Sequence, residues 1–428
     1  MPTYANRGHK AAHGGEMGEP ELGRGTPDVR TVRWLTYLMF FMFAMTTDSV
    51  GLIIPEVIAE FKLGMTTAGA LQYGSMLGIA AAGLGLGFLA DRIGRKRSIM
   101  LGLGVFAATA YLFPAARSFA GILALIVAAG VAIGIFKTGA LALVGDLSAT
   151  SVELTSTMNL VEGFFGVGAI IGPLIVVRLV QQGVSWRWLY VIAGMLCTVL
   201  FVLAARARYP ISTRGAGPER NLLSTLRLVP NRYALGFSLA AFGYVAVECA
   251  IYVWMPTLLS GYRGTDASLV GYALPAFFVM RAAGRFLGAW LLRHVDWSAA
   301  LALSGLAICA CFVGSVVGGL GVALYLLPLA GLFMSIVYPT VNSKGLGCFP
   351  ASEQGAVAGI ILCFTCAGAF LGPLAMGVIS DVSGGPRGGF VFAAALATLL
   401  ATGFGINWLV KPAHAQLGRF VAADAVTA

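Results

Sequence analysis

The residues of this sequence most suited to chemistry are ionisable side chains that lie inside long apolar stretches. They are Asp48, Lys137, Glu162, Glu248, Arg281 and Arg285. Burying such a group at the middle of a membrane costs about 2.5–3.5 kcal/mol on insertion scales, so each is expected to face a cavity or a partner. A buried carboxylate can take up and release a proton, and a buried cation can bind an anion. We therefore expect a functional centre at these positions.

Two of the acids occupy related places in an internal repeat. A shift of 200 or 201 residues aligns Asp48 with Glu248, Pro55 with Pro256, GAIIGP at 168–173 with GAFLGP at 368–373, and Arg187 with Arg387. A parallel repeat of this kind predicts two similar halves with one orientation. The paired acids then lie at equivalent depths, where they either exchange protons or hold helices together through salt bridges.

The other interior candidates are less symmetric. Lys137 either binds an anionic substrate or takes part in coupling, or it only extends its ammonium toward a polar surface. Glu162 lies near one edge of its apolar stretch and has either a structural or a functional role. Arg281 is the deeper of the two arginines and a candidate anion ligand. Tyr338 and Asn342 could add neutral polar contacts.

The elements that must position these side chains are transmembrane helices. Only 11% of the 428 residues are charged and 58% are hydrophobic, too few charges to cover a water-facing surface. Twelve stretches have the length of a membrane span: 33–55, 70–90, 97–114, 120–144, 158–181, 186–205, 233–257, 268–292, 298–318, 322–343, 354–379 and 387–409. The sequence thus predicts an all-α integral membrane protein of twelve transmembrane helices in two six-helix halves.

These stretches divide the chain into five parts. We expect a disordered cytoplasmic tail at 1–32, six-helix halves at 33–205 and 233–409, a cytoplasmic linker at 206–232, and a cytoplasmic tail at 410–428. With both termini in the cytoplasm, few of the 28 Lys and Arg residues lie on the opposite side: Lys62, Arg117, Arg178, Arg187, Arg263 and Arg387. This bias follows the positive-inside rule. We expect a bacterial inner membrane, or an internal membrane derived from it.

The segment between the second and third predicted helices reads GFLADRIGRKR, at 87–97. It resembles the signature loop of the major facilitator superfamily at Gly87, Leu89, Asp91, Arg92, Gly94, Arg95 and Lys96. The resemblance implies that Asp91 binds a neighbouring helix N-terminus or an arginine and helps to close the cytoplasmic side. In the second half, the spacing G-x-x-x-D recurs at Gly377 and Asp381.

Four further strings are similar to the fucose permease-like sugar–proton symporter branch of that superfamily. They are LIIPE at 52–56, NLVEGFFGVGAIIG at 159–172, GRFLGAWL at 284–291 and FMSIVYPT at 333–340. Two interior positions differ from that branch. Asp48 lies about one turn earlier relative to the proline of its helix, and Lys137 occupies a position where the branch carries a glutamate.

Together these features predict a secondary active transporter that works by alternating access. We expect a small polar or anionic solute, such as a sugar, sugar acid or carboxylate, moved with protons. The alternatives are a carrier for a metal cation such as iron, with Asp48, Glu162 and Glu248 along its path, or a drug or metabolite exporter. No phosphate-binding loop, metal motif or nucleophile elbow occurs, so we expect no enzyme, cofactor or bound metal. The expected partners are the solute and the bilayer, without nucleic acid, and the expected state is a monomer.

Overall fold

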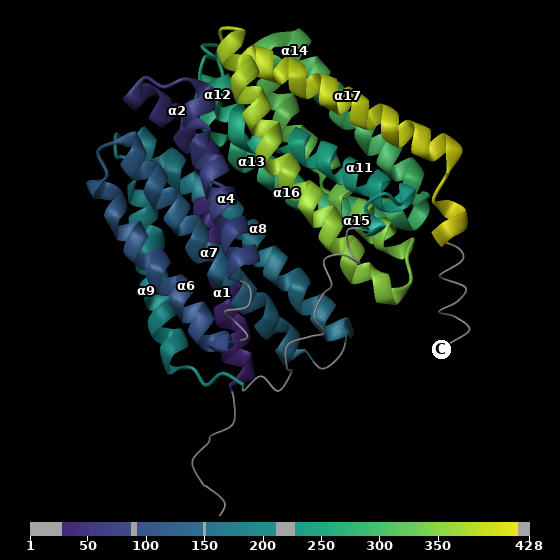
Figure 1. Cartoon of the computed structure of the whole chain (residues 1–428). Coiled ribbons are helices and arrows are strands. Elements are labelled where there is room, and N and C mark those ends of the chain that lie inside the picture. Colours follow the sequence, from purple (N-terminus) through teal and green to yellow (C-terminus); the bar gives the residue numbers. More distant parts are fainter. Residues whose placement is uncertain (1–27, 87–91, 149–150, 211–226, 418–428) are drawn as a thin grey trace, which may run out of the picture.

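The computed structural model describes residues 28–86, 92–148, 151–210 and 227–417. Its first half is a bundle of helices that lies on the left of the molecule in Figure 1. The helices are α1 (Val29–Thr47), α2 (Val50–Phe61), α3 (Met65–Ala68), α4 (Ala70–Gly85), α6 (Arg95–Leu112), α7 (Phe119–Leu147), α8 (Ser151–Gln181) and α9 (Trp188–Arg206). The pairs α1 with α2, and α3 with α4, are each one broken helix, so this half has six crossings.

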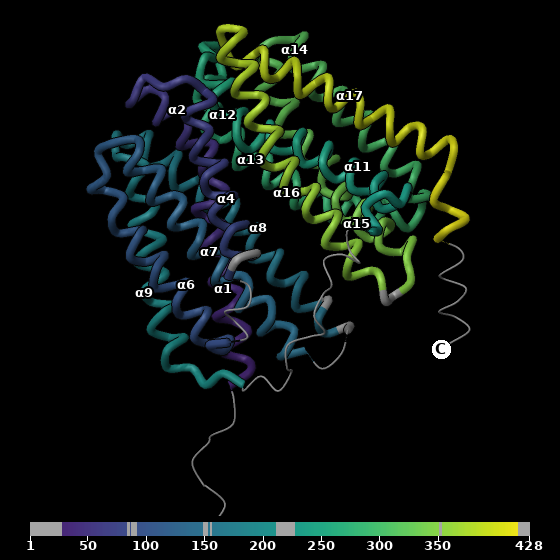
Figure 2. The backbone as a smooth tube through the Cα atoms, in the orientation of Figure 1, coloured from purple at the N-terminus to yellow at the C-terminus, as the bar shows by residue number. Residues whose placement is uncertain are grey.

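The second half repeats that plan. Its helices are α11 (Arg232–Cys249), a π-helix η2 (Ala250–Trp254), α12 (Met255–Leu259), a 3-10 helix η3 (Ala267–Tyr272), α13 (Ala273–His294), α14 (Trp297–Met334), α15 (Val337–Gly347), α16 (Ala351–Val382) and α17 (Pro386–Val410). Here α11, η2 and α12 form one crossing. Figure 2 shows the two bundles as separate groups of tubes.

Twelve crossings are confirmed, although two of them are not apparent from the length of the helices alone. Ten segments are long and apolar enough to span a membrane. The helix α4 has 16 described residues, and 87–91, which follow it, lie outside the described part of the chain. The segment Trp297–Gly347 has 51 residues, too many for one crossing. The chain reverses within it at Gly319, whose φ of 77° suits glycine.

The internal repeat also appears in how helices pack. A Cβ on Gly172 of α8 would lie 2.1 Å from the carbonyl oxygen of Met45, so only glycine lets these backbones meet. A Cβ on Gly372 of α16 would lie 2.7 Å from the Cα of Ala246 in the same way. Small residues allow such close approach between helices in lipid. The two GP strings therefore have one role, which is to seat the fifth helix of each half against its first.

The halves are joined at one end of the molecule. We call this the distal end; it holds the loops after α2, α12 and α16, and it lies opposite the proximal end, which holds both described termini (Figure 1). Tyr73 donates to the carbonyl of Pro373, and Asp381 accepts the backbone N–H groups of Met65 and Thr66. At Gly51 of α2 a Cβ would lie 1.9 Å from the carbonyl oxygen of Tyr252.

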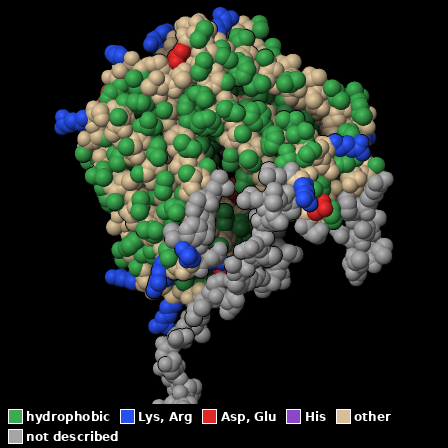
Figure 3. All heavy atoms as spheres, in the orientation of Figure 1, with side chains coloured by type: hydrophobic (Ala, Val, Ile, Leu, Met, Phe, Trp, Pro, Cys, Tyr) green, Lys and Arg blue, Asp and Glu red, His purple; other side chains and the backbone are tan. Residues whose placement is uncertain are grey.

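The surface has the polarity expected for a membrane protein. In Figure 3 hydrophobic side chains dominate the middle of the visible face, while most lysines and arginines lie near its margins. The described part of the predicted C-terminal tail packs on the proximal side of the second half. There His414 stacks on Trp297 and lies 3.2 Å from Asp296, and Ala413 is buried. Most of the predicted first tail and linker lies outside the described residues.

Candidate solute site between the halves

Both acids of the repeat lie where their helix is broken. Between α1 and α2 the hydroxyls of Thr46 and Thr47 bond to the carbonyl of Phe43, and that of Ser49 bonds to Met45. Hydroxyl groups that bond back to the preceding turn bend helices. In the second half the break is the π-helix η2, which follows Cys249, and such π segments are frequent at functional sites.

Helix packing shows how the positions of these two acids correspond in the repeat. Gly172 contacts Met45 and Gly372 contacts Ala246, which sets the register of the first helices at 201 residues. In that register Asp48 corresponds to Cys249, and Glu248 lies one residue earlier. The two carboxylates therefore share a depth, but their side chains leave their helices in different directions, because successive residues of a helix are 100° apart.

Glu248 belongs to a buried polar network. Its side chain is 7% exposed, and Oε1 lies 2.9 Å from Nη2 of Arg281 on α13. The hydroxyl of Tyr244 donates to the same carboxylate at 2.8 Å and lies 2.9 Å from the carbonyl of Met334. A buried carboxylate needs such partners to offset its desolvation. The network joins the first, second and fourth crossings of the second half.

Asp48 and Lys137, both from the first half, form a looser group within electrostatic reach of this network. Asp48 accepts a hydrogen bond from Thr47 at 2.9 Å, and Lys137, Arg281 and Glu248 all act on it electrostatically. The ammonium of Lys137 lies 5.2 Å from the ring centroid of Phe165. Among the described residues Lys137 forms no ion pair, so its charge is available to a ligand.

A cavity of about 450 Å³ lies at this centre and is lined by both halves. Met76 and Ile79 of α4 face it from the first half, and Glu248, Arg281 and Tyr338 from the second. Its volume falls in the range of small-molecule pockets. The structure therefore brings together Glu248, Arg281 and Tyr338, with Asp48 and Lys137 within electrostatic reach.

Two predicted residues lie further from this centre. Glu162 on α8 is exposed and acts electrostatically on Lys137 and Tyr338, so it lies toward the same cavity. It forms no ion pair with any residue that the structure describes. Asn342 is half-buried, one turn beyond Tyr338, and does not line the cavity. Within the described ranges no three His, Cys, Asp or Glu residues converge in a way that could hold a metal ion.

Three lining residues with a hydroxyl or thiol group were not singled out from the sequence. Tyr252, Thr365 and Cys366 all face the central cavity. Cys363 and Cys366 are exposed. Both lie on one face of α16. The sequence does not tell whether that face contacts lipid or lines a cavity, because this depends on where the neighbouring helices pack.

The signature loop ties the proximal ends of the first-half helices together. Gly87 and Asp91 lie outside the described residues. Arg92 is exposed, and Gly94 has a φ of 90° at the start of α6. Arg95 pairs with Asp146 of α7 at 3.1 Å, an acid that the sequence reasoning did not single out. Lys96 donates to the carbonyls of Ala205, in the last turn of α9, and of Ala207, which caps that helix; a helix C-terminus favours a cation.

The related spacing in the second half has a role at the distal end. Asp381 accepts the N–H of Met65 at 2.7 Å and that of Thr66 at 2.9 Å. These N–H groups lie at the start of α3, in the other half of the chain, where a helix offers them no backbone partner. At Gly377 a Cβ would lie 3.1 Å from Thr66, so this glycine admits the contact. We call the Asp381 contact the distal latch.

Comparison with known proteins agrees with this geometry. The sequence profile of the Major Facilitator Superfamily matches residues 36–373. The chain belongs to this superfamily. It is a multi-pass membrane protein whose relatives are transporters. This transporter is 26% identical over 369 residues to a glucose/galactose transporter of Brucella abortus, with 81% of this chain and 87% of the relative covered. It is 25% identical over 389 residues to the L-fucose-proton symporter of Escherichia coli, with 81% and 86% covered.

Solved structures show the same fold. The nucleoside transporter NupG matches this transporter with a TM-score of 0.73 at 14% identity, over 87% of this chain and 98% of the other. A bacterial homologue of the lysosomal transporter Spinster, inward-facing and unoccupied, matches with 0.70 at 15% identity, over 92% and 99%. The Escherichia coli fucose:proton symporter, in the outward conformation, matches with 0.60 at 22% identity, over 88% and 99%.

Proposed function

We propose that this transporter moves a small hydroxylated solute, a sugar or a sugar acid, across the bacterial inner membrane together with protons. The observation that carries the proposal is the polar network of Glu248 and Arg281 beside Asp48 and Lys137, at a cavity lined by both halves. Charges inside a membrane are costly and usually functional. The named substrates of the curated relatives, glucose, galactose and fucose, support the solute class.

The charge of Lys137, which has no ion-pair partner among the described residues, favours the anionic members of that class. A sugar acid would place its carboxylate at Lys137 and its hydroxyls toward polar groups such as Glu248, Tyr338 and Thr365. A charge-assisted hydrogen bond is about twice as strong as a neutral one. The cation can therefore select a sugar acid over the neutral sugar of the same shape.

The described conformation supports alternating access. With both termini in the cytoplasm, as the positive-inside rule favours, the distal end faces outward and is closed by the distal latch. The higher TM-score to the inward-facing structure than to the outward one, despite lower sequence identity, agrees with an inward-facing state. Rocking of the halves would expose the central cavity to each side in turn.

Proton coupling would follow from competition among the interior charges. In this state Asp48 lies near Lys137 and Arg281, and Glu248 is paired with Arg281. Protonation neutralises a carboxylate, so it no longer attracts these cations, and they become available to bind the solute. Release of solute would let the cation return to the carboxylate and expel the proton.

The test is uptake into vesicles that contain the purified protein, under an imposed proton gradient. The solutes are L-fucose, D-galactose and D-galacturonate. Asp48→Asn and Glu248→Gln should abolish the effect of the gradient, while the matched surface control Asp266→Asn should keep it. Unchanged proton-driven uptake in both interior variants would exclude the coupling mechanism. Lys137→Met should remove a preference for galacturonate over galactose, and an equal loss for both solutes would exclude its role as the anion ligand.

A further inference from the structure

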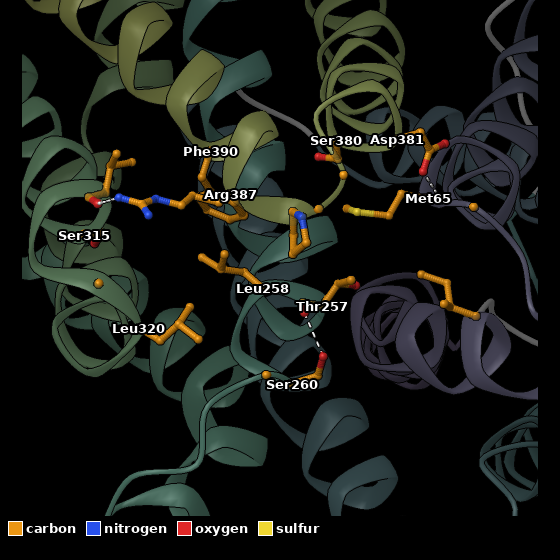
Figure 4. Close-up of a pocket in the computed structure, with 18 of the residues that line it drawn as sticks. Met65, Thr257, Leu258, Ser260, Ser315, Leu320, Ser380, Asp381, Arg387 and Phe390 are labelled. Carbon is orange, nitrogen blue, oxygen red and sulfur yellow. Dashed lines mark hydrogen bonds between the residues drawn. The ribbon is translucent and has the colours of Figure 1, made fainter.

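A second cavity, of about 910 Å³, opens at the distal end, separate from the central one. It is lined by the last turns of α2 and α12 and the loops that follow them, by the turn of α14, by the end of α16 and by the start of α17 (Figure 4). Arg387 extends across it from the start of α17 toward that turn. Its only hydrogen bond among the described residues is a long one, 3.4 Å from Nη2 to the carbonyl of Val316, and it forms no ion pair there.

The equivalent arginine of the first half has a carboxylate partner. Arg187 binds both carboxylate oxygens of Glu60, with Nη1 at 3.1 Å and Nη2 at 2.7 Å. The repeat places Ser260 or Gly261 at the position of Glu60, and both line the distal cavity. The second half therefore keeps the arginine and lacks its carboxylate. The broken symmetry leaves a cation in a cavity where the other half has an ion pair.

Two buried hydroxyl groups also lack partners at this cavity. Ser380 is 1% exposed and Thr257 is 9% exposed, and neither hydroxyl oxygen has a hydrogen-bond partner among the described residues. Both residues line the cavity, Ser380 from α16 and Thr257 from α12 (Figure 4). Leaving a buried hydroxyl unpaired costs about 1–3 kcal/mol, which a ligand with hydroxyl groups would recover.

From this geometry we infer that the distal cavity binds a small hydroxylated carboxylate of the sugar-acid class. The carboxylate would take the place beside Arg387 that Glu60 takes beside Arg187, and hydroxyl groups would reach Ser380 and Thr257. Asp381 lies on the side of the cavity away from Arg387 (Figure 4). Its negative charge orients the ligand, with the carboxylate toward Arg387 and the hydroxyls toward Asp381. This site does not depend on which solute crosses the membrane.

The experiment is equilibrium titration of the purified full-length protein in detergent with D-gluconate. D-Galactose serves as the neutral control. Arg387→Gln should weaken gluconate binding by about tenfold or more, because one charge-assisted contact is lost. The matched control Arg117→Gln, which removes an exposed distal charge outside the cavity, should leave binding unchanged. Ser260→Glu should also block gluconate, since it returns a carboxylate to the position of Glu60.

Three results would overturn the inference. The first is absence of gluconate binding to the unmodified protein. The second is equal gluconate binding by the unmodified protein and by Arg387→Gln, together with loss of binding in Lys137→Met. That result would locate all gluconate binding in the central cavity, and the proposed transport site would stand. The third is equal weakening of gluconate binding by Arg387→Gln and by the control Arg117→Gln, which would show an effect of distal charge in general and not of this cavity. Thermal melting of each variant separates loss of the site from loss of the fold.

Discussion

The distal latch offers the most direct perturbation of the transport cycle, through the substitution Asp381→Asn. The carboxylate of Asp381 accepts two backbone N–H groups, from Met65 and Thr66, each through a different oxygen. The amide that replaces it has one acceptor oxygen, so at least one of the two hydrogen bonds is lost. The remaining bond also loses its charge assistance.

The size of the effect follows from these contacts. A hydrogen bond to a charged group contributes about 1.5–3 kcal/mol. Asp381 is exposed, so solvent screening reduces the loss toward about 1 kcal/mol. That corresponds to roughly a fivefold change in the ratio of distal-open to distal-closed protein. We expect the variant to fold normally, because the latch joins the halves and not the helices of one half.

Two measurements on the full-length protein test this reasoning. Amide hydrogen exchange at Met65 and Thr66 should be about fivefold faster in the variant, because exchange reports the open fraction. Alkylation of Cys366, which is exposed in the central cavity, should become slower as the proximal side closes. The control Asp266→Asn removes a distal acid whose carboxylate is hydrogen-bonded only to Tyr325, of the same half, among the described residues. Faster exchange with unchanged Cys366 alkylation would refute a gating role for the latch.

Two more substitutions follow from the contacts. Gly51→Ala places a Cβ 1.9 Å from the carbonyl oxygen of Tyr252, so overpacking should disfavour the distal-closed state by about 1–3 kcal/mol. Alkylation of Cys366 should then become slower. In the control Gly236→Ala the new Cβ meets nothing within 4 Å, so the alkylation rate should stay unchanged. Burial raises the pKa of Asp296, but hydrogen bonds from its neighbours outweigh it and lower the pKa to about 2, below the ordinary 3.8. Its stabilisation is therefore present above pH 3.8 and lost as pH falls to 2. Asp296→Asn should lower the thermal midpoint at neutral pH, by an amount matching roughly 1 kcal/mol after screening, and the difference should vanish in acid; a difference independent of pH would contradict the assignment.

Much of the architecture could be predicted from local properties of the sequence. A membrane helix must satisfy its own backbone hydrogen bonds and bury its own apolar side chains, so hydropathy along the chain predicts each crossing. The reversal at Gly319 was predicted in this way, between the stretches 298–318 and 322–343. The repeat was also visible, because the glycines of both GP strings are needed for the same close helix contact.

The partners of the interior charges could not be predicted in this way. Asp48 and Glu248 looked equivalent in the sequence, yet the packing register separates them by one residue, and the structure pairs Glu248 with Arg281. Lys137 remained without an ion pair among the described residues. An ion pair depends on how two helices are rotated against each other, and that rotation is set by side-chain packing along their whole length.

The number of crossings, the two halves and the superfamily could be predicted without a structure, because these depend on hydropathy, spacing and a short motif. Only the packing of the two bundles shows which end is closed and which charges have no ion-pair partner within the described part of the chain. Asp381 meets Met65 across 316 positions of the chain, and Arg387 lacks the acid that Arg187 has in Glu60. Such contacts join residues that no local pattern connects, since they form only when two complete bundles are placed against each other.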